Sequence, residues 1–128
     1  MNQAAPKRIL VADDSDTITT LLETALTAGG YEVLIARNGF DTYELGKSEN
    51  VDLVILDHLM PGLLGLEIIE RWRSEGIEVP VIVLSGVDDD RTVVSSLEVG
   101  AVDFVRKPFR LNELMARVKQ RFPSERDS

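Results

Sequence analysis

Short apolar runs alternate with longer amphipathic stretches along this chain. Valine, isoleucine and leucine dominate each run, and nearly every position within it is apolar. Such continuous hydrophobicity is typical of strands buried on both faces of a parallel sheet, rather than of strands with one face in water. The pattern predicts five strands, over residues 8–12, 32–36, 51–56, 79–84 and 102–105.

The stretches between these runs carry apolar residues at helical spacing. Over residues 15–28 the apolar stripe consists of Ile18, Leu21, Leu22, Ala25 and Leu26. Further helices are predicted over residues 63–75 and 88–99, and a glycine follows each of these three segments, as is common where a helix ends. The repeated order of strand and helix predicts one α/β domain, an open parallel sheet with helices on both faces.

Composition narrows the setting of this domain. The chain has 128 residues, no cysteine and a formal net charge of −8. A domain of this length needs no disulfide, and the lack of cysteine excludes thiolate metal sites and fits a reducing cytoplasm. The negative charge disfavours direct binding of nucleic acid, and no apolar stretch reaches the roughly 20 residues of a membrane span. We therefore expect a soluble, cytoplasmic protein.

Polar residues whose side chains could take part in a reaction follow the carboxyl ends of the predicted strands, where open α/β sheets bind their ligands. They are Asp13 and Asp14 after strand one, Asp57 after strand three, Ser85 after strand four and Lys107 after strand five. Three carboxylates in one crevice repel one another unless a cation joins them, and Mg²⁺ suits such oxygen ligands. With a lysine and a hydroxyl beside them, they are suited to phosphoryl transfer onto an aspartate. Strand two ends at residues 37–38, which have no obvious chemical partner.

Four segments together resemble the receiver domain of two-component response regulators. They are ILVADD with its acidic pair, VILDHLMPGLLG, which fits the phosphoacceptor pattern D-x-x-M-P-x-x-x-G, VIVLSG with its hydroxyl, and GAVDFVRKPF with an aromatic residue followed by Lys-Pro-Phe. The resemblance implies a flavodoxin-like, doubly wound (βα)5 fold with five parallel strands in the order 2-1-3-4-5. It places the receiver domain at residues 7–122, between an N-terminal extension (1–6) and a polar tail or truncated linker (123–128).

The resemblance also gives the acidic residues their roles. Asp57 is the expected phosphoacceptor, and the phosphoryl group comes from a sensor histidine kinase or a histidine phosphotransfer protein that docks beside helix one. Asp14 and Asp57 are expected to bind Mg²⁺ directly, or Mn²⁺ in its place. The backbone carbonyl of Leu59 and waters complete the shell, and Asp13 acts through water.

Ser85 and Lys107 are expected to hold the phosphoryl oxygens, with a cis peptide bond between Lys107 and Pro108. In this family the strand-five aromatic, here Phe104, rotates inward on phosphorylation, although a static core aromatic is an equal interpretation of this residue. The face of helix four, strand five and helix five then contacts a downstream protein, an effector domain or a second copy of the chain. Such a protein is no enzyme toward other molecules, because it catalyses only the phosphorylation and dephosphorylation of its own aspartate.

Further expectations concern the phosphate lifetime and the packing of residues near the site. Leu59 and Val87 stand at positions that influence hydrolysis of the phosphoryl group in receivers, and because neither side chain can orient a water we expect a long-lived aspartyl phosphate. The leucines at 59, 63 and 64 form an apolar patch that we expect to pack locally. We expect His58 to face away from Asp57, and Trp72 to lie in the core.

Two other classes of protein share parts of this pattern. A haloacid dehalogenase phosphatase needs a second acid two residues after its nucleophile, where this chain has Leu59. A flavodoxin-like FMN carrier needs a loop that cradles phosphate after strand one, where the acidic segment DDSDT would repel it. A receiver-fold module that binds partners without being phosphorylated stays open as the alternative, as does the question of whether the chain is a stand-alone receiver or part of a longer regulator.

Overall fold

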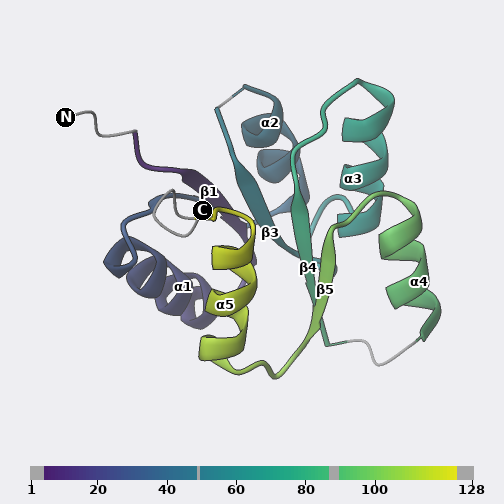
Figure 1. Cartoon of the computed structure of the whole chain (residues 1–128). Helices are drawn as coiled ribbons and strands as arrows, with labels where there is room; N and C mark the ends of the chain where they lie inside the picture. The colour runs from purple at the N-terminus through teal and green to yellow at the C-terminus, as the bar shows by residue number, and fades with distance from the viewer. Residues whose placement is uncertain (1–4, 49, 87–89, 124–128) are drawn as a thin grey trace.

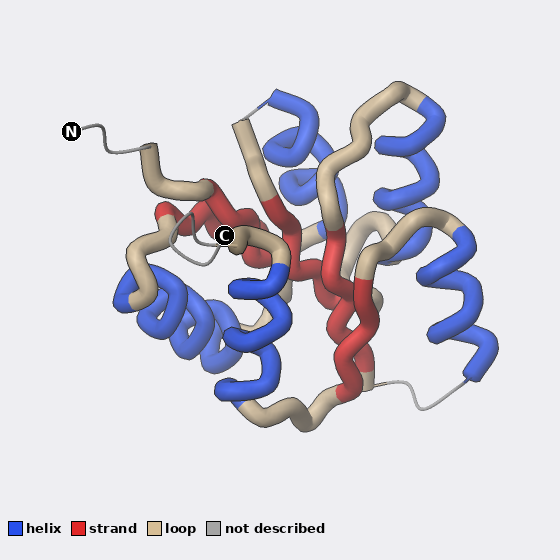
Figure 2. The backbone as a smooth tube through the Cα atoms, viewed as in Figure 1, coloured by secondary structure: helices blue, strands red, loops and turns tan. Residues whose placement is uncertain are grey.

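The computed structural model describes residues 5–48, 50–86 and 90–123, in which five strands and five helices alternate along the chain (Figures 1 and 2). The strands are β1 (Arg8–Ala12), β2 (Glu32–Ala36), β3 (Leu53–Asp57), β4 (Val81–Ser85) and β5 (Asp103–Arg106). The helices are α1 (Asp16–Ala28), α2 (Gly39–Ser48), α3 (Gly65–Ser74), α4 (Asp90–Glu98) and α5 (Leu111–Gln120). In the described residues, no helix is both long enough and apolar enough to cross a membrane.

All neighbouring strands run parallel, in the order β2-β1-β3-β4-β5, which confirms the predicted fold. Helices α1 and α5 cover one face of the sheet, and α2, α3 and α4 cover the other (Figure 1). Alternate strand residues divide between two cores, because successive side chains of a strand point to opposite faces. In β1, Ile9 and Val11 pack with α1 and α5, whereas Leu10 and Ala12 pack with α3.

The boundaries differ from the predicted ones where side chains compete for the backbone. β4 begins at Val81 and not at residue 79: Pro80 has no N–H for the sheet, and the Val79 carbonyl accepts a hydrogen bond from Arg73 Nη2 at 2.9 Å. The same guanidinium also reaches the carbonyls of Ile77 and Gly100, at 2.8 and 3.0 Å. α3 is shorter than predicted, with Leu64 as its N-cap, and α4 begins at Asp90, while the earlier positions of its predicted range, 88 and 89, lie outside the described residues.

The end of β2 has partners that the sequence did not reveal. Arg37 Nε lies 2.8 Å from a carboxylate oxygen of Asp16 in the first turn of α1. Asn38 accepts a hydrogen bond from the Asp41 N–H at 2.8 Å and so caps the start of α2. Residues 37–38 therefore have structural contacts, an ion pair and a helix cap, that the sequence pattern did not indicate.

The contact between α2 and α3 depends on a glycine. Trp72 is fully buried, as predicted, and its indole N–H donates to the Tyr43 carbonyl at 3.1 Å. A Cβ atom at Gly46 would lie 2.2 Å from Cζ2 of Trp72, so the indole occupies the space that a side chain at this position would need. The two helices meet closely because Gly46 has none.

β5 is an edge strand, and an acidic side chain is bound to its backbone. Asp103 Oδ1 accepts from the Phe104 N–H at 2.8 Å, and both carboxylate oxygens accept from Arg117 Nη1 of α5, also at 2.8 Å. This pair fastens α5 to the edge of the sheet.

Candidate functional site

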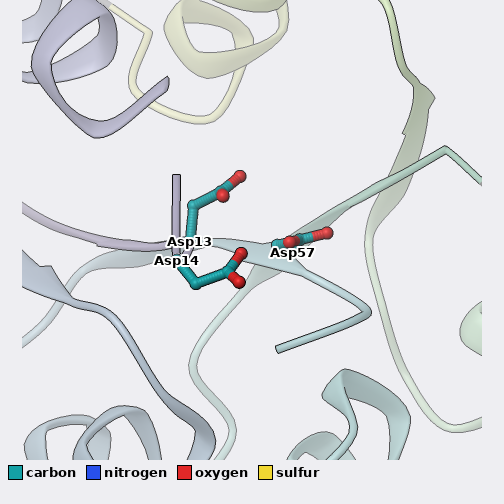
Figure 3. Close-up of side chains that lie close together, drawn as sticks. All are labelled: Asp13, Asp14 and Asp57. Atoms are coloured by element: carbon teal, nitrogen blue, oxygen red, sulfur yellow. The ribbon is translucent and has the colours of Figure 1, made fainter. Parts of the chain in front are cut away.

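Three aspartates meet at the carboxyl ends of the neighbouring strands β1 and β3. Asp13 and Asp14 directly follow β1, and Asp57 is the last residue of β3. Figure 3 shows the three side chains close together, and each offers a carboxylate oxygen within 4.8 Å of the others. The parallel pairing of β1 with β3 explains this proximity, because both strands end at the same edge of the sheet.

The three carboxylates differ in exposure. Asp13 and Asp57 are buried, at 1% and 6% exposure, whereas Asp14 is exposed. Both oxygens of Asp13 already have partners, since Oδ1 accepts from the Ser15 N–H at 2.9 Å and Oδ2 accepts from Lys107 Nζ at 2.9 Å. Asp14 therefore has more freedom to turn toward a ligand than Asp13.

Lys107 supplies positive charge between the two buried carboxylates. Its Nζ lies 2.9 Å from Asp13 and 3.5 Å from Asp57, and the peptide bond between Lys107 and Pro108 is cis, as expected. Burial lowers the pKa of Lys107, but its hydrogen bonds and charge interactions with the two aspartates outweigh this effect, and the pKa is raised. Lys107 therefore stays protonated and positively charged at neutral pH.

The Asp57 carboxylate lies in an environment that disfavours its charge. Burial, followed by repulsion from Asp13, raises the pKa of Asp57 from 3.8 to about 6, although Lys107 and a 3.4 Å hydrogen bond from the Leu59 N–H act in the opposite direction. Three carboxylates and one ammonium leave about two negative charges when all are ionised, which a divalent cation would neutralise. The site thus has the oxygen ligands and the charge that suit Mg²⁺.

The other predicted residues differ in their surroundings. Ser85 is buried and ends β4, one residue after Leu84, the sheet partner of Asp57. Phe104 is half-buried against the core formed with α3, and the Arg106 guanidinium lies 5.9 Å from the centre of its ring. Val87 lies outside the described residues. His58 is buried, which lowers its pKa, and its Nδ1 has no hydrogen-bond partner within the described part of the chain.

The apolar residues around the site correct two expectations. Leu63 packs locally as predicted, at 9% exposure, but Leu59 and Leu64 are 51% and 43% exposed. Leu21, which the helical stripe assigned to the core, is 40% exposed and lines a groove beside Lys107. This groove, of about 410 Å³, is formed by Ile18, Leu21, Lys107, Pro108 and Phe109. The stripe alone could not distinguish it from core, because the loop after β5 that completes it is distant in sequence.

Comparison with known proteins supports the fold and shows the family. The family model of the response regulator receiver domain matches residues 9–119, and the chain belongs to this family. It is 38% identical to the alkaline phosphatase synthesis transcriptional regulatory protein PhoP of Bacillus subtilis over 113 residues, which cover 88% of this chain and 47% of PhoP. The chain thus spans about half the length of the curated relatives it matches.

Solved receiver structures superpose closely on this chain. A Francisella response regulator receiver domain has a TM-score of 0.87 and 30% identity, covering 95% of this chain and 99% of its own. The beryllofluoride-activated receiver domain of Klebsiella pneumoniae RstA has a TM-score of 0.84 and 27% identity, covering 92% of this chain and all of its own. Both likenesses extend over nearly the whole chain.

Proposed function

We propose that this receiver is a phosphorylation-dependent switch whose phosphoacceptor is Asp57. The observation that carries the proposal is the pairing of a buried carboxylate at the end of β3 with two further carboxylates and an ammonium, all within a few ångströms. A P–O bond forms between an Asp57 oxygen and the phosphorus of a phosphohistidine while the P–N bond breaks, and its electron pair returns to the imidazole. The donor is a sensor histidine kinase or a histidine phosphotransfer protein.

The residues at the site have distinct parts in this reaction. Asp14 and Asp57 would bind the metal directly with the Leu59 carbonyl, whereas Asp13, whose oxygens are engaged by Ser15 and Lys107, would act through water. Bound Mg²⁺ supplies positive charge that offsets the charge of the phosphoryl oxygens. Lys107 adds a second positive charge and Ser85 a hydroxyl donor, and both would bind oxygens of the transferred phosphoryl group.

The donor would dock in the groove beside Lys107. It borders α1 and shares Lys107 with the carboxylate cluster, and the rest of its lining is apolar, from Ile18, Leu21, Pro108 and Phe109. An apolar side chain of the donor placed here would bring the phosphohistidine close to Asp57. On phosphorylation, Ser85 and Phe104 would rearrange, and the face of α4, β5 and α5 would contact a downstream protein, an effector domain or a second copy of the chain.

Contacts between the two ends of residues 7–122 support this range as the folded receiver. Phe122 packs against Tyr31 with their ring centres 5.8 Å apart, and Lys7 Nζ lies 5.8 Å from the centre of the Phe122 ring. These contacts lie at the amino ends of β1 and β2, at the opposite end of the sheet from the aspartates.

The direct test is covalent labelling. The protein is incubated with Mg²⁺ and a small phosphodonor such as acetyl phosphate, and separately with beryllofluoride, and is compared with Asp57→Asn by intact mass and by Trp72 fluorescence. We expect one phosphoryl group on the wild type, none on the variant, and no labelling when EDTA removes the metal. A wild-type protein that accepts no phosphoryl group from small donors or from kinases would favour the phosphorylation-independent binding module.

The exposed leucine next to the site predicts a slow loss of phosphate. Leu59 is 51% exposed and has no side-chain group that could orient an attacking water. We expect Leu59→Asn to shorten the lifetime of the aspartyl phosphate about tenfold, because an amide can hydrogen-bond that water. The measurement is the decay of phosphorylated protein after removal of the donor, with Leu64→Asn as a control of similar exposure. Equal decay in Leu59→Asn and wild type would contradict this role.

A further inference from the structure

The loop that follows the phosphoacceptor strand is fastened to the first turn of α2. The Gly39 N–H donates to the Pro61 carbonyl at 2.7 Å. A Cβ atom at Gly39 would lie 2.4 Å from the Leu63 nitrogen and 2.5 Å from its carbonyl oxygen, so the two backbones are in direct contact. Leu63 is itself held in the core, which fixes the far end of the loop.

Phe40 lies over the middle of this loop. A Cβ atom at Gly62 would be 3.0 Å from Cδ2 and 3.2 Å from Cε2 of Phe40, so the ring covers the open side of this glycine. Gly62 has a φ of 96°, a conformation that other residues adopt only with strain. Phe40 is nevertheless 61% exposed, so the ring adds little to the core, and its packing is directed at the loop.

The near end of the loop is anchored at His58, whose N–H donates to the Leu84 carbonyl at 2.9 Å and whose carbonyl accepts from the Gly65 N–H at 2.8 Å. The contact of Leu59 itself with Asp57 is weaker. The Leu59 N–H lies 3.4 Å from Asp57 Oδ1, which is long for an N–H···O hydrogen bond. The Met60 side chain is buried, but the backbone between it and Leu63 has its neighbours in α2, at Gly39 and Phe40. The position of the Leu59 carbonyl, which follows the anchored His58, therefore depends also on how firmly α2 holds the rest of the loop.

We propose that Phe40 is a positioning residue for the phosphorylation site, whose ring restrains the loop that carries the Leu59 carbonyl. This inference rests on the proposed function, because the carbonyl matters only if the aspartates take Mg²⁺. Without the ring the loop samples more conformations, and metal binding then includes the cost of ordering it. The result is weaker binding of Mg²⁺ with little change in the stability of the fold.

The test compares Mg²⁺ affinity with stability in the same variants. By titration calorimetry without phosphodonor, we expect Phe40→Ala to raise the Mg²⁺ dissociation constant about fivefold. Phe40→Tyr, which keeps the ring, is expected to stay within about twofold of wild type. Leu97→Ala, in α4, is the matched control, because Leu97 is also an exposed apolar residue, at 48%, and lies outside the site. Its affinity is expected to be unchanged.

A second measurement isolates the loop from the metal. In metal-free protein, the amide hydrogens of Leu59 and Gly62 are expected to exchange faster in Phe40→Ala than in wild type, while those of β3 do not change. Gly62→Ala, whose new methyl group would displace the ring, is expected to weaken Mg²⁺ binding in the same direction. Wild-type protein that binds no Mg²⁺ would overturn the proposed function itself. Wild-type binding with equal affinity in Phe40→Ala would overturn only the role of Phe40.

Discussion

Gly46→Ala is expected to destabilise the protein by about 2 to 3 kcal/mol, although alanine is the better helix former. The added methyl group would lie 2.2 Å from Cζ2 and 2.7 Å from Cε2 of the fully buried Trp72, so either the indole or the whole of α2 must move. The gain in helix propensity, about 1 kcal/mol, is smaller than the cost of this overpacking. Urea denaturation followed by far-UV circular dichroism measures the difference.

Ser48→Ala, at an exposed position in the same helix, is the control and is expected to change the stability by less than about 0.5 kcal/mol. The double variant Gly46→Ala/Trp72→Phe tests the cause. Because phenylalanine is smaller than tryptophan, the two substitutions are expected to be less harmful together than their separate costs would add up to. A Gly46→Ala protein as stable as wild type would show that the space beside Trp72 is larger than the structure indicates.

Asp57→Asn is expected to stabilise the metal-free protein at pH 8 by up to about 3 kcal/mol. The folded protein raises the pKa of Asp57 from 3.8 to about 6, chiefly through burial and then through repulsion from Asp13. A raised pKa stabilises the fold while the group is protonated, and this contribution is lost as the pH rises through 6. Asparagine carries no charge at any pH, so the variant avoids the loss.

The pH dependence of the unfolding free energy distinguishes the charge effect of Asp57 from an effect of the substitution that is independent of charge. The difference in unfolding free energy between Asp57→Asn and wild type is expected to be near zero at pH 4, to grow between pH 4 and 6, and to level off above pH 7. Glu70→Gln, which removes an exposed carboxylate in α3, is expected to show no such rise. Millimolar Mg²⁺ is expected to stabilise wild type more than the variant, because the metal offsets the repulsion. A constant difference across the pH range would contradict the charge argument.

The sequence predicted the sheet well because its inner strands β1, β3 and β4 are buried on both faces. β1 and β2 have the predicted bounds, and the order of all five strands is confirmed. Errors occurred where a side chain takes up backbone groups, as Arg73 does at Val79, or where Asp103 interrupts the apolar pattern of β5 and moves it to Asp103–Arg106. Such contacts join residues far apart in sequence, so local pattern does not reveal them.

The strand ends alone predicted that the three aspartates lie close together. They did not predict how the aspartates differ in exposure and in hydrogen-bond partners. That Asp13 is enclosed by Ser15 and Lys107 while Asp14 is exposed depends on side-chain geometry at the end of β1. The contact between Phe40 and Gly62 was missed for a similar reason, because an exposed aromatic in a helix gives no sign of the loop beneath it. The glycines at 39 and 62 are sequence features that could have indicated a close approach at that place.

The carboxylate at the edge of the sheet limits how this receiver can associate. An open edge strand invites another chain to add a strand through main-chain hydrogen bonds. In β5 the Phe104 N–H is already bound to Asp103, and Arg117 holds that carboxylate in place. A partner that adds a strand to β5 would have to displace this contact, so association at this edge favours recognition of side chains, whose charges can be matched selectively.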